Sequence, residues 1–238
     1  MHQITVNDLT VDVVRKDIKN LHLAVYPPAG RVRVAVPLRV NDEAVRLAVI
    51  SKLGWIRRQQ RSFQEQERQS AREYVSGESH YFQGLRYLLN VIYHDGWPRV
   101  ELRGKKRIDL YVRKGSDTAT RERIFLQWYR RQLKAQAAPM IAKWEPIIGV
   151  TVADWGIKQM KTRWGSCNAQ AARIWLNLEL IKKSPQCLEY LVVHEMVHLL
   201  ERLHSDAFKA HMDAFLPQWR LNREELNREP LAHETWTY

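Results

Sequence analysis

Two histidines and a glutamate stand at a spacing that can do chemistry. His194, Glu195 and His198 form the pattern H-E-x-x-H within the stretch YLVVHEMVHLLERLHSDAF of residues 190–208. Side chains four residues apart lie on one face of a helix, so both imidazoles reach a single Zn²⁺ at about 2.0–2.1 Å. The glutamate is displaced around the helix, where it addresses a water on the metal rather than the metal itself. The pattern predicts a zinc-dependent hydrolase with Glu195 as general base.

A third protein ligand is expected, because catalytic zinc sites have three protein ligands and keep one position open. His204 follows His198 by six residues, which is the spacing of a metzincin site. The glycine of the metzincin pattern is replaced by Glu201, so the tight turn of that class is not predicted. His211 and His233 compete with His204, which we favour for its spacing.

Other polar side chains near the histidines are candidates for supporting roles. Glu201 lies on the ligand face, three residues after His198, where it either bonds a ligand histidine or is solvated at the helix end. Tyr190, one turn before the pattern, and Arg163 are candidates for stabilising charge in the transition state. Cys167 raises the alternative of a cysteine hydrolase, but no base is evidently paired with it, and a structural thiol is the simpler interpretation.

The helix that carries the pattern is expected to be buried. Ser184 and Pro185 are typical of a helix N-cap and first position. Apolar residues then surround the helix, and polar groups among them need partners, which a metal provides. These apolar residues are Leu188, Leu191, Val192, Val193, Met196, Val197, Leu199 and Leu200. Two short helices are predicted near residues 205–216 and 217–229.

A hairpin is expected before this helix, at residues 150–178. Its second strand, residues 173–178, should lie beside the active helix, and we expect its exposed edge to bind an extended peptide by strand addition. Ordinary pairing with another strand is the alternative. Asn177 either binds backbone near the site or ends the strand.

The rest of the chain reads as a strand-rich part with one long helix. Alternating patterns predict strands within residues 1–40 and 79–114, and Asn41 is placed to cap a helix over residues 42–69. A further helix is predicted at residues 120–138, where Pro139 either ends it or starts a continuation. No internal repeat is evident. We expect an α+β fold, with a strand-rich N-terminal part at 1–115 and a minimal zincin-type helical metallopeptidase part with a β-hairpin at 116–238.

The composition is that of a chain with a sizeable core and no membrane span. Of its 238 residues, 45% are hydrophobic and the mean hydropathy is −0.47. The apolar runs are too short to cross a bilayer, and the first residues do not resemble a secretion signal. Two widely spaced cysteines, Cys167 and Cys187, form neither a disulfide framework nor a metal-binding pair. We expect a cytoplasmic protein with no membrane partner.

The charge is strongly basic and uneven. The net charge is +12; residues 1–115 hold 21 Lys and Arg against 12 Asp and Glu, a net +9, and residues 116–238 hold 17 against 14, a net +3. A basic surface attracts polyanions, so nucleic acid is a candidate partner of the N-terminal part. A solvated basic surface without a partner is the alternative.

In the residues around H-E-x-x-H and in several other motifs, the chain resembles the YgjP-like metallopeptidases, a family described as predicted metal-dependent hydrolases. The shared motifs are RWGSC at residues 163–167, N-x-x-L at 177–180, and H-E-x-x-H followed by H-S-x-x-F at 194–208; KLGWI at 52–56 and SGESHYFQGLRYLL at 76–89 also fit. The resemblance implies His194, His198 and His204 as zinc ligands, Glu195 as base, and a peptide or protein substrate. Many members have a second aromatic residue where this chain has Lys209. The ending H-S-x-x-F also resembles the SprT and Spartan zincins, some of which cleave proteins crosslinked to DNA.

Three functions follow from these observations. The first is a zinc metallopeptidase. The second is a DNA-associated protease that localises through its basic N-terminal part, which a steep salt dependence of DNA binding would distinguish. The third is a non-catalytic, zinc-stabilised binding module, which fits less well because structural zinc sites are closed by four protein ligands.

Overall fold

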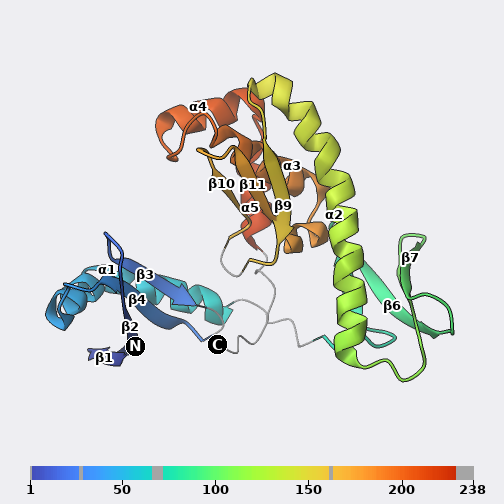
Figure 1. Cartoon of the computed structure of the whole chain (residues 1–238), viewed down its shortest axis with the longest axis horizontal. Coiled ribbons are helices and arrows are strands. Elements are labelled where there is room, and N and C mark those ends of the chain that lie inside the picture. The colour runs from blue at the N-terminus through green and yellow to red at the C-terminus, as the bar shows by residue number, and fades with distance from the viewer. Residues whose placement is uncertain (1, 27–28, 66–71, 161–162, 229–238) are drawn as a thin grey trace. The chain divides into compact units, whose positions relative to one another are not determined.

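The computed structural model describes residues 2–26, 29–65, 72–160 and 163–228. They fall into two compact units, divided between Ser70 and Ala71 (Figure 1). The two parts predicted from sequence meet at residues 115 and 116, which lie within the second unit, because the strands before this point share a core with the helices after it. Sheets and helices in both units confirm the α+β class.

The first unit is a four-stranded sheet covered by one helix. The strand order is β1-β2-β4-β3, with β2 and β4 parallel and the other neighbours antiparallel. Asn41 caps the helix as predicted, accepting a hydrogen bond from the backbone N–H of Ala44 at 2.9 Å. Val45 and Ile56 of the helix are buried against the sheet; residues 66–69 of the predicted helix lie outside the described residues. The elements are β1 (His2–Val6), β2 (Leu9–Lys16), β3 (His22–Tyr26), β4 (Arg31–Pro37) and α1 (Asp42–Glu65).

The second unit begins with a sheet of the same topology, a similarity that no repeat in the sequence indicates. Its order is β5-β6-β8-β7, again with the two central strands parallel and the outer pairs antiparallel. In both sheets a two-residue turn joins the first pair of strands, with positive φ at Asn7 in one and at Gln83 and Gly84 in the other. The strands are β5 (Ser79–Phe82), β6 (Leu85–Tyr93), β7 (Arg99–Arg103) and β8 (Arg107–Val112).

A long helix, α2 (Thr118–Ile148), follows this sheet and extends well past the predicted end at residue 138. Pro139 and Pro146 lie inside the helix, so neither ends it. Both prolines are exposed, and water can bond the carbonyls that lose their partners. Burial of Ile141 and Trp144 in the core of the unit holds the continuation in place.

A three-stranded sheet next to the site differs from the predicted hairpin. The strands are β9 (Asp154–Lys158), β10 (Gly165–Asn168) and β11 (Arg173–Asn177), in the order β10-β11-β9. β10 and β11 form the hairpin, whereas β9 pairs with β11 in parallel. The expectation that residues 173–178 offer an exposed edge is therefore wrong: β11 is the central strand, and β10 is the edge strand next to the site.

Four helical elements complete the second unit. The one that carries H-E-x-x-H packs against α2, against β10 and against the two helices that follow it (Figure 1). No helix of the described ranges combines the length and apolar character that crossing a bilayer requires. The elements are a 3₁₀ helix η1 (Leu178–Lys182), α3 (Pro185–Val197), α4 (Asp206–Phe215) and α5 (Trp219–Arg228).

Candidate metal centre

Helix α3 holds the first two histidines and the glutamate in a buried frame. Ser184 caps the helix as predicted, accepting a hydrogen bond from the backbone N–H of Cys187 at 3.4 Å, and Pro185 takes the first position. Most of the helix between them and His194 is buried, as its apolar surface predicts. The helix ends at Val197, so His198 is its C-cap and the chain can turn back towards the site.

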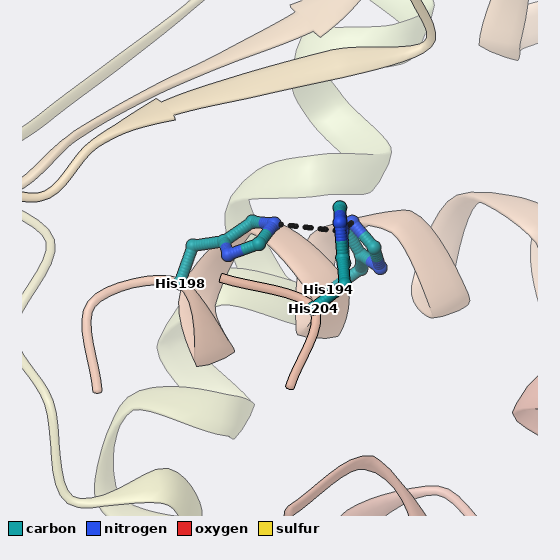
Figure 2. A group of neighbouring side chains, drawn as sticks. All are labelled: His194, His198 and His204. Atoms are coloured by element: carbon teal, nitrogen blue, oxygen red, sulfur yellow. Dashed lines mark hydrogen bonds between the residues drawn. The ribbon is translucent and has the colours of Figure 1, made fainter. Parts of the chain in front are cut away.

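The three histidines predicted as ligands lie together. Nε2 of His204 lies 3.1 Å from Nε2 of His194 and 3.2 Å from Nε2 of His198. Figure 2 shows the three rings converging: His194 from α3, His198 from the C-cap of that helix, and His204 from the segment that follows. Among the described residues they form a group of potential metal ligands whose ligand atoms all lie within 4.8 Å of one another.

Hydrogen bonds turn the Nε2 atoms towards this common point. Nδ1 of His198 lies 3.0 Å from the main-chain carbonyl of Glu201, and a carbonyl only accepts, so this Nδ1 carries the proton and Nε2 of a neutral ring is left with a lone pair. Nδ1 of His194 lies 3.5 Å from the hydroxyl of Tyr190, which can hold that ring in the same way.

The arrangement fits a metal ion. Lone pairs that face one another at 3.1–3.2 Å repel unless a cation or proton lies between them. Two nitrogens bound to a tetrahedral ion at about 2.0–2.1 Å are about 3.3 Å apart. Burial, with smaller effects from the charges of neighbouring His198, His204 and Arg223, lowers the pKa of His194 to about 3. That ring is neutral at physiological pH, as a ligand must be.

The third histidine is held by a turn rather than by a helix. His204 precedes Ser205, whose hydroxyl accepts a hydrogen bond from the backbone N–H of Phe208 at 3.3 Å and caps α4. The Phe208 ring is 2% exposed, and its centroid lies 4.7–5.0 Å from the centroids of all three imidazoles. Phe208 thus closes one side of the site to water, a role that its place in the motif did not reveal.

Glu195 lies between the helix and the edge strand. It is 4% exposed, and a β-carbon on Gly165 of β10 would stand 2.5 Å from its Oε1. Burial raises the pKa of Glu195 to about 8, against the charge of Arg163, which lowers it. A cation among the histidines would favour the carboxylate form. The proton affinity of Glu195 is therefore set by its surroundings, as is common for groups that transfer protons.

Asn177 binds backbone near the site, the first of the two roles considered for it. It is fully buried, and its amide nitrogen donates to the carbonyl of Met160 at 2.8 Å and to that of Arg163 at 2.7 Å. Its amide oxygen accepts from the backbone N–H groups of Met160 and Glu179 at 3.3 and 3.2 Å. This one side chain fixes the approach to β10 and therefore to Glu195.

The other three candidates for supporting roles are Glu201, Tyr190 and Arg163. The Glu201 carboxylate accepts a hydrogen bond from the backbone N–H of Leu203 at 3.1 Å. The main-chain carbonyl of Glu201, and not its carboxylate, contacts His198. Tyr190 is 4% exposed, and burial raises its pKa to about 12, so at neutral pH its hydroxyl is a hydrogen-bonding group. Arg163 is exposed beside the site.

Two other described residues considered from the sequence, His211 and Cys167, do not join this group. His211 lies on α4 with its ring stacked on Phe215 at 6.0 Å, and His233 lies outside the described residues. Burial, with a contribution from the charge of Glu195, raises the pKa of Cys167 to about 11. Its thiol is protonated at neutral pH, which argues against the cysteine-hydrolase alternative.

A cavity of about 1120 Å³ opens in front of the histidines, within the second unit. Its lining includes Gly165, Ser166 and Cys167 of the edge strand and Trp219 and Arg223 of α5. A polypeptide segment can therefore enter next to Glu195 and the three Nε2 atoms.

Comparisons with known proteins identify a family and two similar solved structures. The family described as "YgjP-like, metallopeptidase domain" matches residues 19–229, which include the site and parts of both units. Among solved structures, the chain is similar to the metallopeptidase zymogen abylysin of Pyrococcus abyssi, at 14% identity and a TM-score of 0.37, over 40% of this chain and 99% of that one. The zymogen jannalysin of Methanocaldococcus jannaschii gives 14% identity and a TM-score of 0.35, over 39% and 94%. No curated protein matches the chain.

Proposed function

Because this chain belongs to the YgjP-like metallopeptidase family, and so is a metal-dependent peptidase, we propose that its metal is zinc and that Glu195 is the general base. The observation that carries the proposal is the convergence of three imidazole Nε2 atoms beside a buried glutamate. The residues predicted from the spacing of H-E-x-x-H and from His204 are the ones that support it.

The donor set favours zinc over harder cations. Three neutral imidazole nitrogens suit zinc, whereas magnesium, calcium and manganese prefer carboxylate and carbonyl oxygens. Among the described residues, no carboxylate joins the three histidines in a ligand group. The adjoining cavity leaves room for a water and a substrate carbonyl, as a catalytic site requires.

The side chains around the histidines have distinct tasks in hydrolysis. Zinc bound there would supply a Lewis acid that makes water a nucleophile near neutral pH. Glu195 takes a proton from the attacking water on a carboxylate oxygen and gives it to the leaving amine. Phe208 keeps other water away from the imidazoles, and Asn177 fixes the backbone that leads to β10. Arg163 and Tyr190 stay candidates for meeting charge that develops on the substrate carbonyl.

The edge strand is the proposed peptide-binding element. β10 pairs with β11 on one side, and on its other side it has no strand neighbour among the described residues. An extended substrate that adds to this edge runs along the wall of the cavity, past Glu195. The peptide-binding role that the sequence assigned to residues 173–178 thus passes to β10.

Two alternatives are distinguished by their consequences. A non-catalytic binding module would hold zinc without turnover, but an open cavity beside three ligands favours catalysis. A DNA-associated protease would require nucleic acid for cleavage; its support is the basic charge of residues 1–115.

A cytoplasmic location also stays a prediction, supported by two free cysteines.

The decisive experiment is cleavage of an unfolded test protein by the zinc-loaded full chain, with and without single-stranded DNA. We expect cleavage by the wild type and none by Glu195→Gln at equal zinc content. Glu189→Gln is the matched control, because Glu189 lies on the same helix but bonds Lys143 and Trp144 outside the cavity, at 2.7 and 3.0 Å.

Each outcome has a clear meaning. Cleavage that persists in Glu195→Gln would remove this residue as the base. Cleavage only in the presence of DNA would favour the DNA-associated protease. Bound zinc without cleavage of any protein or peptide would favour the binding module.

A further inference from the structure

The cavity next to the three histidines is walled by positive charge. Four cationic side chains line the cavity. Among the described residues, the one carboxylate in the lining is that of Glu195, at the reacting centre. The four are Arg163, Arg202, Lys209 and Arg223. Away from the reacting groups, each charged side chain of this lining carries a positive charge.

Three of these cations are not neutralised by a carboxylate of the described residues, and Arg223 lies over the Trp219 ring with its Cζ 6.0 Å from the ring centroid. Lys209 lies 2.8 Å from a carboxylate oxygen of Asp206 and is neutralised locally. Arg163, Arg202 and Arg223 have no ion pair with any described residue. Arg220 provides a contrast on the same helix as Arg223: its Nη2 lies 3.1 Å from Oδ2 of Asp213, and it does not line this cavity.

The three arginines without an ion pair come from different segments of the chain. Arg163 stands just before β10, Arg202 lies in the segment between α3 and α4, and Arg223 is on α5. Arg223 is close enough to His194 and His204 for its charge to act on both rings. A substrate in the cavity therefore meets guanidinium groups that come from three different segments of the chain.

Resting on the proposed peptidase function, we propose that this cavity selects peptides with acidic side chains beside the scissile bond, with Arg202 and Arg223 as specificity-determining residues. A guanidinium group matches a carboxylate with two parallel hydrogen bonds. A concave wall of one sign attracts ligands of the opposite sign and repels those of its own. A peptide is the occupant because the arginines line the cavity at the centre of a metallopeptidase and share its wall with a free strand edge.

The test separates binding from turnover. Zinc-loaded Glu195→Gln protein, as the full chain, is titrated into three fluorescent peptides with the same neutral centre and flanks of Asp, Ser or Lys, and anisotropy gives each Kd. We expect the Asp peptide to bind at least about tenfold more tightly than the Lys peptide, with Ser between them. The preference should shrink as salt rises.

Variants assign the preference to residues. Arg202→Gln and Arg223→Gln, each combined with Glu195→Gln, should weaken binding of the Asp peptide about threefold or more and leave the Ser peptide nearly unchanged. Arg131→Gln is the matched control, because Arg131 is exposed on α2 of the same unit and does not line the cavity. It should keep the full preference.

Several results would overturn the inference. They are equal affinities for the three peptides, a loss in Arg131→Gln as large as in Arg223→Gln, or a single-stranded oligonucleotide of equal length that displaces the Asp peptide and binds more tightly. Wild-type cleavage is assayed separately. If binding does not depend on the charge of the peptide but cleavage is intact, only this inference is overturned. If the chain prefers acidic peptides but cleaves nothing, only the peptidase proposal is overturned.

Discussion

Gly165 and Glu195 lie in such close contact that no side chain fits between them. A β-carbon at position 165 would stand 2.5 Å from Oε1, 2.9 Å from Cδ and 3.0 Å from Cγ of Glu195. The backbone of β10 therefore forms the wall against which the carboxylate rests. The position of the proposed base is set by the edge strand as well as by its own helix.

Gly165→Ala should impair hydrolysis more than stability. The added methyl group must push the Glu195 carboxylate aside, which a flexible side chain allows at little cost to folding. A displacement of about 1 Å in a reacting group can reduce the rate about a hundredfold, so we expect kcat/KM to fall about ten- to a hundredfold at unchanged zinc content. Gly54→Ala on α1 is the control, since the nearest atom to its added carbon would lie 3.8 Å away. Full activity in Gly165→Ala would contradict the close contact.

His204→Ala should lower zinc affinity, because it removes one of three converging Nε2 atoms. Changes to groups that merely support a ligand reduce metal affinity about 10–100-fold, and loss of a ligand should cost at least as much. Zinc content after dialysis against a competing chelator is the measurement. His211→Ala, on the following helix, should retain its zinc. The reverse result would identify His211 as the ligand.

Asn177→Ala should destabilise the second unit by about 3 kcal/mol, because it leaves several buried main-chain groups without partners. Urea unfolding followed by tryptophan fluorescence gives the free energy of unfolding. Asn168→Ala serves for comparison: Asn168 is exposed and accepts one hydrogen bond, from the backbone N–H of Ala171, so its loss should stay below about 1 kcal/mol. Equal losses in the two variants would show that the four bonds of Asn177 carry no special weight.

His80 should make the second unit sensitive to acid. Its ring is 4% exposed and lies 4.5 Å from the ring of Phe125, centroid to centroid. Burial, aided by the charges of Arg72 and Lys182, lowers its pKa to about 3. Below about pH 6.5 the unfolded chain binds a proton that the folded chain does not, so stability is full above that pH and is lost as pH falls towards 3.

Urea unfolding of the metal-free protein at pH 7.5 and 5.0 measures this effect. His80 should account for up to about 2 kcal/mol of the difference between the two pH values, and this share should vanish in His80→Phe. His22→Gln, on an exposed position of β3, should leave the pH dependence unchanged. If His80→Phe and the wild type lose equal stability on acidification, His80 is not the sensitive group.

Features that depend on residues close together in the sequence could be predicted. The capped start of α3, its all-round apolar surface and the H-E-x-x-H spacing all lie within 184–198, and the structure has the helix, its burial and the two imidazoles together. His204 could be foreseen because it is only six residues away. The family, fold class and metallopeptidase activity are confirmed, whereas the roles of individual site residues stay predictions.

Features that depend on residues far apart in sequence could not be predicted. Alternation identifies a strand but not its neighbour, so the parallel pairing of β9 with β11 and the edge position of β10 were missed. The contact of Gly165 with Glu195 depends on that edge position. The repeated sheet topology was hidden because different side chains fill equivalent places. The local sequence left open whether Pro139 ends the helix or whether the helix continues, and tertiary burial of Ile141 and Trp144 decides for the continuation.

The location of all three histidines within residues 194–204 has a consequence for how the protein matures. Such a site has a low contact order: closing a loop of ten residues costs about 2 kcal/mol of chain entropy, apart from a constant term. A chain that has formed α3 and the segment after it already holds every imidazole, whether or not the sheets of the two units have formed. Metal capture at that stage would tie the start of α4 to α3 and guide the later helices into place.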